Sequence, residues 1–224
     1  MPELPEVETC RRALEPVLVG QTIGRYAHST KRLREQAQSS DMVELAGLTI
    51  SALERRSKYL VIRAQSELVL VHLGMTGQLF VSDESTPPWL DHEHWRLELS
   101  SGWLRYRDPR RFGMLIRCSQ GQFDEHPRIK NLGPEPLLEA WTDDDFLAVC
   151  KTSSRPIKTL IMDAATVVGV GNIYAAEALF AAGIDPRRSA SRIAPRRLRR
   201  LKLEIVRVLN RALESGGSTI RNFV

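Results

Sequence analysis

The residues that follow the initiator methionine carry the groups best suited to chemistry in this chain. The sequence opens MPELPEVET, so removal of Met1 would expose the secondary amine of Pro2. An α-amino group titrates near about 8, against about 10.4 for a lysine, and at neutral pH it is therefore deprotonated far more often. Such a nitrogen can attack an electrophilic carbon and form an iminium. The adjacent carboxyl group of Glu3 can move the proton that this step requires.

The same residues also have a purely structural interpretation. Pro5 favours the first turn of a helix, and Glu6 and Glu8 would then complement the positive end of the helix dipole. The opening nine residues alone leave both interpretations open.

Composition and length restrict the class of protein. With 224 residues, 42% of them hydrophobic, the chain predicts a globular protein with room for two domains. No apolar run reaches the roughly 18 residues of a membrane span, and the acidic, proline-containing N-terminus is unlike a signal peptide. We therefore expect a cytoplasmic protein. Cys10, Cys118 and Cys150 lie far apart and predict packed, reduced thiols without a disulfide framework or a zinc site.

The net charge of +5 is unevenly distributed. Residues 151–224 carry 14 Lys/Arg against 5 Asp/Glu, whereas residues 1–150 carry 18 against 22. A basic block of this kind is typical of a surface that binds a polyanion, although charge runs are more often solvated helix faces. The block includes Arg187, Arg188, Arg192, Arg196, Arg197, Arg199, Arg200 and Lys202.

The order of the elements predicts a multidomain protein of separate β and α parts. A helix from Pro5 to Val17 precedes short β-branched, apolar runs, which indicate an antiparallel β-sandwich with a flanking helix. The proline- and glycine-containing stretch His126–Pro136 indicates a linker. We place a β-sandwich catalytic domain at residues 1–131, an interdomain linker at 132–140 and an all-helical domain at 141–224. The expected strands are Thr49–Ser51, Tyr59–Arg63, Leu68–His72, Gln78–Val81, Trp95–Leu99, Trp103–Arg107 and Met114–Cys118. In the second part, one helix is expected to start after the capping residue Thr142, and further helices are expected at Ile157–Asp163, Ile173–Ala182 and Ala194–Glu214. Gly216 and Gly217 are expected to end the last of these helices.

Six motifs occur in order along nearly the whole chain, and together they resemble the signatures of the formamidopyrimidine-DNA glycosylase family. The resemblance implies a bifunctional DNA glycosylase and AP lyase of base excision repair, with a helix–two-turn–helix domain as the helical part. The motifs are Pro2–Thr9, Arg56–Leu60, His72–Gly77, Asp108–Gly113, Leu132–Leu137 and Gly169–Ala175.

The resemblance assigns roles to individual residues. Pro2 is implied as the nucleophile, Glu3 as the proton carrier and Lys58 as a catalytic-site lysine that grips a phosphate next to the lesion. An enzyme that extrudes a base must fill the gap left in the stack; Met75 is implied to fill it, Arg110 to pair with the orphaned cytosine and Phe112 to wedge the stack. Asn172 is implied to bind a phosphate at a helix N-terminus, and Glu6, Lys158 and Glu177 to support the active site, Glu177 as an interior carboxylate.

Each of these residues also has a structural alternative. Met75 and Phe112 fit a hydrophobic core, and Arg110 fits a surface ion pair. Lys58 fits a solvated lysine at a strand start, and Asn172 an ordinary helix N-cap.

The chain departs from the family pattern at its C-terminus. The family continues past the segment that matches Gly216–Phe223 into a loop over the flipped base and a four-cysteine zinc finger, whereas this chain ends at Val224. We therefore expect no metal cofactor in this chain. The resemblance implies a monomer of bacterial type, associated with the nucleoid, whose partner is damaged double-stranded DNA rather than a membrane.

The favoured function is removal of oxidised purines, such as 8-oxoguanine and formamidopyrimidines, through a Schiff base at Pro2 followed by β,δ-elimination. One alternative is an endonuclease VIII-like glycosylase for oxidised pyrimidines; Leu4 and the run from Arg110 to Phe112 favour the purine branch. Others are a non-catalytic homologue that only binds damaged DNA, against which the presence of both Pro2 and Glu3 argues, and a small-molecule enzyme with an N-terminal proline base.

Overall fold

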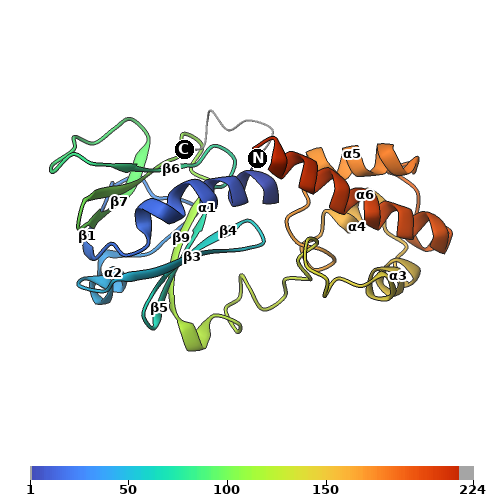
Figure 1. The fold of residues 1–224 in the computed structure, drawn as a ribbon, viewed down its shortest axis with the longest axis horizontal. Coiled ribbons are helices and arrows are strands. Elements are labelled where there is room, and N and C mark those ends of the chain that lie inside the picture. The colour runs from blue at the N-terminus through green and yellow to red at the C-terminus, as the bar shows by residue number, and fades with distance from the viewer. Residues whose placement is uncertain (1, 217–224) are drawn as a thin grey trace. The chain divides into compact units, whose positions relative to one another are not determined.

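The computed structural model describes residues 2–216, and they divide into two compact units (Figure 1). Among the described residues, the first unit consists of Pro2 and Glu6–His126, and the second of Glu3–Pro5 and residues 127–216. No helix among residues 2–216 combines the length and the apolar character that crossing a membrane requires.

The first unit is a β-sandwich of two sheets, flanked by the helix α1 (Leu4–Leu18). One sheet has the strand order β1-β7-β8-β6 and the other β2-β9-β5-β4-β3. The expected antiparallel arrangement is found throughout except for the short β2, which pairs with β9 in parallel. The strands are β1 (Ile23–His28), β2 (Glu35–Gln36), β3 (Ile50–Arg56), β4 (Tyr59–Ala64), β5 (Glu67–His72), β6 (Gln78–Ser82), β7 (Glu93–Leu99), β8 (Gly102–Arg107) and β9 (Met114–Ser119), with the short helices α2 (Ser39–Met42), η1 (Val43–Leu45) and η2 (Gln120–Gln122) between and after them.

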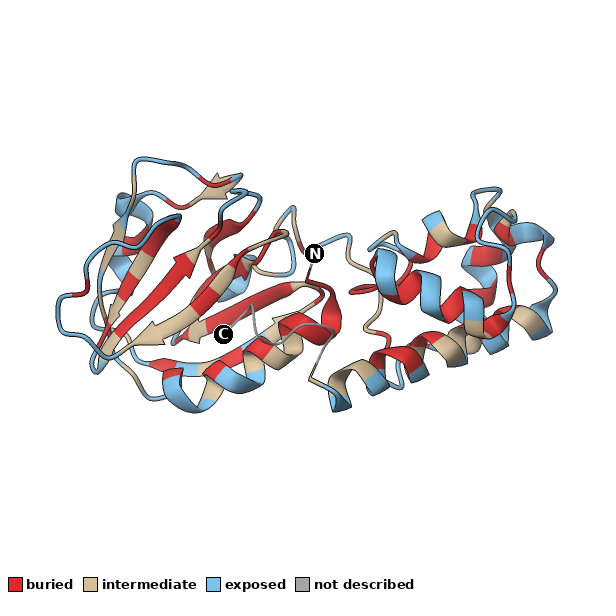
Figure 2. Cartoon of the chain, turned by 90° about the horizontal axis from the view of Figure 1, so that it is seen from above, coloured by how far each residue is buried: buried red, intermediate tan, exposed pale blue. Residues whose placement is uncertain are grey.

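The core of the first unit follows from the period of its elements. Alternate residues of β7 face inward, and Trp95 stacks on Tyr106 of β8 with ring centroids 5.4 Å apart. The helix α1 buries residues at three- and four-residue spacing, which is the apolar stripe expected of a helix on a sheet. These are Val7, Cys10, Leu14 and Leu18. Figure 2 shows buried residues along the strands of the first unit and at intervals along the helices of both units.

The second unit is helical over the rest of the described chain. Thr142 is the N-cap of its first long helix and accepts a hydrogen bond from the backbone N–H of Asp145, as the sequence predicts. Gly183 ends α5 in the left-handed conformation with φ 67°. The helices are α3 (Asp143–Thr152), α4 (Ile157–Ile161), α5 (Asn172–Ala182), η3 (Ala190–Arg192) and α6 (Pro195–Glu214).

The long helix α6 packs its apolar stripe into the core of the second unit. Its buried residues are Leu198, Leu201, Ile205, Val208 and Leu209. Ser215 is its C-cap and Gly216 has a φ of 77°; Gly217, the other residue expected to end the helix, lies outside the described residues.

The stretch between the two units contains no helix or strand from Phe123 to Trp141, as the prolines and glycine in His126–Pro136 predict. The domain boundaries at residues 131 and 141 stay predictions.

Candidate functional site

The carboxylate of Glu3 is seated on the N-terminus of α5. It is buried, with 2% of the residue exposed, and accepts hydrogen bonds from the backbone N–H groups of Gly171 (2.6 Å), Ile173 (2.9 Å) and Tyr174 (3.4 Å). These donors and the positive end of the helix dipole both favour the charged carboxylate. Glu3 is therefore held at a fixed position of the second unit.

Close backbone approach explains the glycines of this turn. The backbone N–H of Leu4 donates to the carbonyl of Gly169 at 3.0 Å. A Cβ on Gly171 would overlap the carboxyl carbon of Glu3. The turn that begins at Gly169 is thus shaped around the first residues of the chain, a relation that the sequence separation of 168 positions hides.

Asn172 is the first residue of α5, and Gly171 is its N-cap, so the interpretation of Asn172 as an ordinary N-cap is wrong. Glu3 already accepts hydrogen bonds from backbone N–H groups at this end of the helix, so a phosphate bound here would need other, exposed hydrogen-bond donors. Asn172 is exposed and could provide such a donor.

Pro2 and Glu6 belong to the first unit, and both are buried. Only 5% of Glu6 is exposed, although it lies in the first turn of α1, where the structural interpretation expects a solvated carboxylate. The burial of Glu6 distinguishes it from the half-buried Glu8 on the same helix.

Lys58 lies on the two-residue turn between β3 and β4, because Arg56 pairs with Tyr59 across the hairpin. It therefore occupies the turn itself, and the expectation of a lysine at a strand start is off by one residue. Ser57, the other turn residue, has a left-handed φ of 57°, and its carbonyl accepts a hydrogen bond from the guanidinium of Arg55 at 3.0 Å. Arg55 thus holds the turn that carries Lys58.

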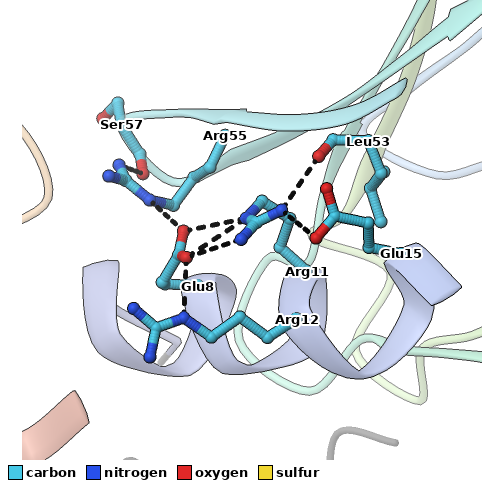
Figure 3. Close-up of polar contacts among 7 residues, drawn as sticks. All are labelled: Glu8, Arg11, Arg12, Glu15, Leu53, Arg55 and Ser57. Carbon is cyan, nitrogen blue, oxygen red and sulfur yellow. Dashed lines mark hydrogen bonds and ion pairs between the residues drawn. The ribbon is translucent and has the colours of Figure 1, made fainter. Parts of the chain in front are cut away.

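The opposite side of Arg55 is fixed by Glu8, as Figure 3 shows. Glu8 accepts hydrogen bonds from Arg55 (3.1 Å), Arg11 (3.1 Å) and Arg12 (3.0 Å). Burial raises the pKa of Glu8, but the hydrogen bonds from Arg11 and Arg12 and the charge of Arg55 outweigh it and hold the pKa below its ordinary value of 4.5. Glu8 is therefore a charged link between α1 and the Lys58 turn, beyond the dipole role that its sequence position suggests.

The loops that carry Met75 and Arg110 are joined by Asp108, which is fully buried. Its carboxylate accepts hydrogen bonds from the hydroxyl of Thr76 (2.5 Å) and from the backbone N–H groups of Arg110 (3.2 Å) and Gly113 (2.8 Å). One buried charge thus satisfies donors from both loops, which fixes their relative position.

The two loops also touch directly at Gly74. This residue has a φ of 64°, and a Cβ there would lie 2.6 Å from backbone atoms of Phe112 and Gly113. Arg110 stacks its guanidinium over the ring of Phe112, 4.9 Å from the centroid. Phe112 is 44% exposed and Met75 is half-buried, so neither is the core residue of the structural alternative. Among residues 2–216 no ion pair involves Arg110, so its surface-pair alternative finds no support either.

A cavity of about 620 Å³ opens at these loops. It brings together the three wedge candidates Met75, Arg110 and Phe112 with a segment that the sequence analysis does not single out. Its lining consists of Arg32, Leu33, Arg34, His72, Gly74, Met75, Arg110, Arg111 and Phe112.

Two supporting residues lie elsewhere in the second unit. Lys158 is half-buried on the short α4, and its backbone N–H donates to the carbonyl of Pro186. Glu177 is exposed on α5 beside Arg211, at a pocket of about 330 Å³. The expectation of an interior carboxylate at Glu177 is therefore wrong: the buried face of α5 is formed by other positions, which include Tyr174 and Ala178.

Two arginines of the basic block form hydrogen bonds with carbonyl groups at the C-terminal end of α5. The guanidinium of Arg200 donates to the carbonyl of Ala181 at 2.9 Å, and that of Arg197 donates to the carbonyl of Gly183. Cations at a helix C-terminus satisfy its free carbonyls and its dipole. The charge of this block is thus only partly available for a polyanion.

The three cysteines are free and buried, as expected. Burial raises the pKa of Cys10 and of Cys150 to about 12, so both are neutral thiols at pH 7. Among residues 2–216 no group of three or more His, Cys, Asp or Glu side chains could hold a metal ion.

Comparison with known proteins gives consistent matches over both units. The model of the formamidopyrimidine-DNA glycosylase N-terminal domain matches residues 1–115, and that of the formamidopyrimidine-DNA glycosylase H2TH domain matches residues 132–224. The formamidopyrimidine-DNA glycosylase of Stutzerimonas stutzeri is 50% identical over 225 residues, covering 100% of this chain and 82% of the relative. That of Pseudomonas aeruginosa (strain LESB58) is 48% identical with the same coverage.

Solved structures agree. The MutM (Fpg) protein of Thermus thermophilus is similar with a TM-score of 0.86 and 40% identity, over 97% of this chain and 78% of that one. The Fpg of Lactococcus lactis, in complex with DNA that contains N7-benzyl-Fapy-dG, is similar with a TM-score of 0.90 and 32% identity, over 99% of this chain and 82% of that one.

Proposed function

Because this chain belongs to the formamidopyrimidine-DNA glycosylase family, a family of DNA-repair enzymes, we propose that it removes oxidised purines from duplex DNA and cleaves the strand at the resulting abasic site. The observation that carries the proposal is the seat of Glu3: a carboxylate held charged by three backbone N–H groups, directly next to the residue whose nitrogen becomes the chain terminus.

The chemistry follows from these two neighbours. The lone pair of the Pro2 nitrogen attacks C1′ of the extruded nucleotide, and the bond from C1′ to the base breaks; the base leaves with the bonding electron pair and takes up a proton from water. The secondary amine then loses its proton, and the charged carboxylate of Glu3 is suited to receive it. Opening of the sugar ring forms the iminium and needs a proton on the ring oxygen, which the protonated Glu3 can return.

Strand cleavage continues from the iminium. Loss of a C2′ proton expels the 3′ phosphate by β-elimination, and a second elimination expels the 5′ phosphate. We assign the phosphate grip next to the lesion to Lys58 and Asn172, and the filling of the emptied stack to Met75, Arg110 and Phe112. Glu6, Lys158 and Glu177 are proposed to support the lesion pocket, Glu177 from the exposed face of α5.

Borohydride trapping on a duplex with an abasic site tests the nucleophile. The wild-type chain, with Met1 removed, should form a covalent adduct, and Pro2→Gly should trap far less. Glu3→Gln should bind the duplex but slow the formation of the iminium, because the amide cannot take up the proton. Equal trapping by Pro2→Gly and wild type would overturn the assignment of Pro2.

Lesion preference is tested separately. Excision from 8-oxoguanine and thymine glycol duplexes should favour 8-oxoguanine. A preference for thymine glycol would instead assign the chain to oxidised pyrimidines, and binding of both duplexes without any cleavage would leave a DNA-binding protein only.

A further inference from the structure

The cavity beside the wedge residues contains two arginines to which no role has been given. Arg32 and Arg34 line it together with Arg110 and Arg111, and all four are exposed. Among residues 2–216 no carboxylate lines this cavity, and no ion pair involves Arg32, Arg34 or Arg111. Four neighbouring cations without an anion favour a ligand that carries several negative charges.

The segment that carries these arginines is anchored from inside. Leu33 is buried in the sandwich core with 7% exposed, so its neighbours on either side face outward. The next residues form β2, which pairs with the start of β9. The buried Leu33 therefore leaves Arg32 and Arg34 on the exposed side of this segment, where both line the cavity.

The same segment is joined to the loop of Arg110 and Arg111 by backbone contacts. The N–H of Arg34 donates to the carbonyl of Arg111 at 3.1 Å, and Arg111 has the left-handed φ of 58°. A non-glycine residue in this region is strained, and such strain is found mainly where surrounding structure requires it.

His94 supplies a second joint. It is buried, with 1% exposed, and its two ring nitrogens lie 2.9 Å from the carbonyls of Lys31 and Asp108. One ring therefore contacts the residue before Arg32 and the residue that organises the Arg110 loop. The four arginines are held as one unit by the fold of this domain.

We propose that Arg32 and Arg34 bind backbone phosphates of the strand opposite the lesion, next to the orphaned base. The inference rests on the proposed function, in which Arg110 contacts that base. A nucleotide that reaches Arg110 brings its own flanking phosphates to the same cavity, and guanidinium groups suit phosphate oxygens. Lys58 lies on a different turn and is not part of this cavity. The fold thus presents separate cations for the two strands.

Methylphosphonate scanning tests the assignment. The probe is a duplex with a tetrahydrofuran abasic analogue opposite cytosine, in which single phosphates are replaced on either strand by the neutral group. For the wild type, neutral groups next to the orphaned cytosine should weaken binding. For Arg34→Ala this penalty should largely disappear, while the penalty for neutral groups on the lesion strand remains.

The salt dependence gives a second readout. Arg34→Ala should reduce the slope of log affinity against log salt by about one unit, and Arg32→Ala with Arg34→Ala by about two. Arg25→Ala is the matched control: it removes the same charge from an exposed position on β1 that does not line the cavity, and its strand pattern should equal that of the wild type. Thermal unfolding midpoints show whether each variant is folded.

The outcomes distinguish a wrong assignment of Arg32 and Arg34 from a wrong proposed function. If Arg34→Ala keeps the full penalty on the orphan strand, or loses the penalty on the lesion strand instead, the assignment of Arg32 and Arg34 is overturned. If the wild type does not prefer the tetrahydrofuran duplex to undamaged DNA, the proposed function itself fails.

Discussion

Replacing Asp108 should loosen both loops that carry the wedge candidates. In Asp108→Asn, the remaining carbonyl oxygen can still accept from the buried N–H of Gly113, and the hydroxyl of Thr76 can turn to accept from the new amide. The backbone N–H of Arg110 then faces an amide donor instead of a carboxylate oxygen. The substitution therefore removes about one charged hydrogen bond, worth about 1.5–3 kcal/mol.

Asp108→Ala removes all four acceptor contacts, including that with the hydroxyl of Tyr106 (3.4 Å), and leaves a cavity at a fully buried position. We expect it to cost about 4 kcal/mol or more, since each unsatisfied buried donor costs about 1–3 kcal/mol. Excision opposite cytosine should fall in both variants by more than the fraction of unfolded protein explains, because the Arg110 loop loses its fixed position.

Urea unfolding followed by tryptophan fluorescence measures this, because three of the four tryptophans lie in the first unit. Asp124→Asn, the same chemical change at an exposed aspartate, is the control and should stay within about 0.5 kcal/mol of the wild type. If Asp108→Asn behaved like this control in both stability and excision, the view of Asp108 as the joint between the loops would be refuted.

Further predictions concern the other turns of the site. Glu8 has a lowered pKa in the folded state, so its stabilising effect is complete above pH 4.5 and is lost as the pH falls through the folded pKa. Glu8→Gln should therefore be less stable than the wild type at pH 7, and the difference in the free energy of urea unfolding should shrink below pH 4.5. Gly171→Ala should abolish borohydride trapping while DNA binding is retained, because its Cβ would displace the Glu3 carboxylate; unchanged trapping would contradict the proposed seat. Lys58→Ala should reduce the slope of log affinity against log salt by about one unit and weaken binding to damaged and undamaged DNA alike. Met75→Ala should instead impair lesion processing with little change in this slope. Indistinguishable slopes of the two variants in a salt titration would refute the distinction between residues that bind phosphates and residues that fill the stack.

The elements that the sequence predicts well are those with a strong local signal. Thr142 with its three following aspartates marks a helix start, and the α6 stripe has an unbroken helical period. The strand β1 was missed, because its Gly24, Arg25 and Tyr26 give no alternation and the strand contains an irregularity in its pairing with β7. Its formation depends on cross-strand partners that a local pattern does not contain.

The site is predictable from sequence only where a motif carries it. The sequence gives no signal for Arg32 and Arg34, because a short run of basic residues ordinarily indicates a solvated surface. Only the fold shows that the buried Leu33 anchors this segment beside the Arg110 loop. An interior carboxylate at Glu177 is implied by the family resemblance alone, and it is wrong because Glu177 lies on the exposed side of α5, whose apolar residues extend beyond the buried face to the 90% exposed Phe180.

A common construction underlies the candidate functional turns. Glu3 accepts N–H groups of the turn before Tyr174, Glu8 acts through Arg55 on the turn of Lys58, and Asp108 joins the loops of Met75 and Arg110. Each turn has an irregular backbone that cannot satisfy its own polar groups as a helix or sheet does. A carboxylate can accept several such groups at once, and it does so with charge-assisted strength. Because a buried charge is costly once its partners move, each carboxylate restricts its turn to one conformation. The residues that would meet DNA are thereby held in place by neighbours that need not touch it.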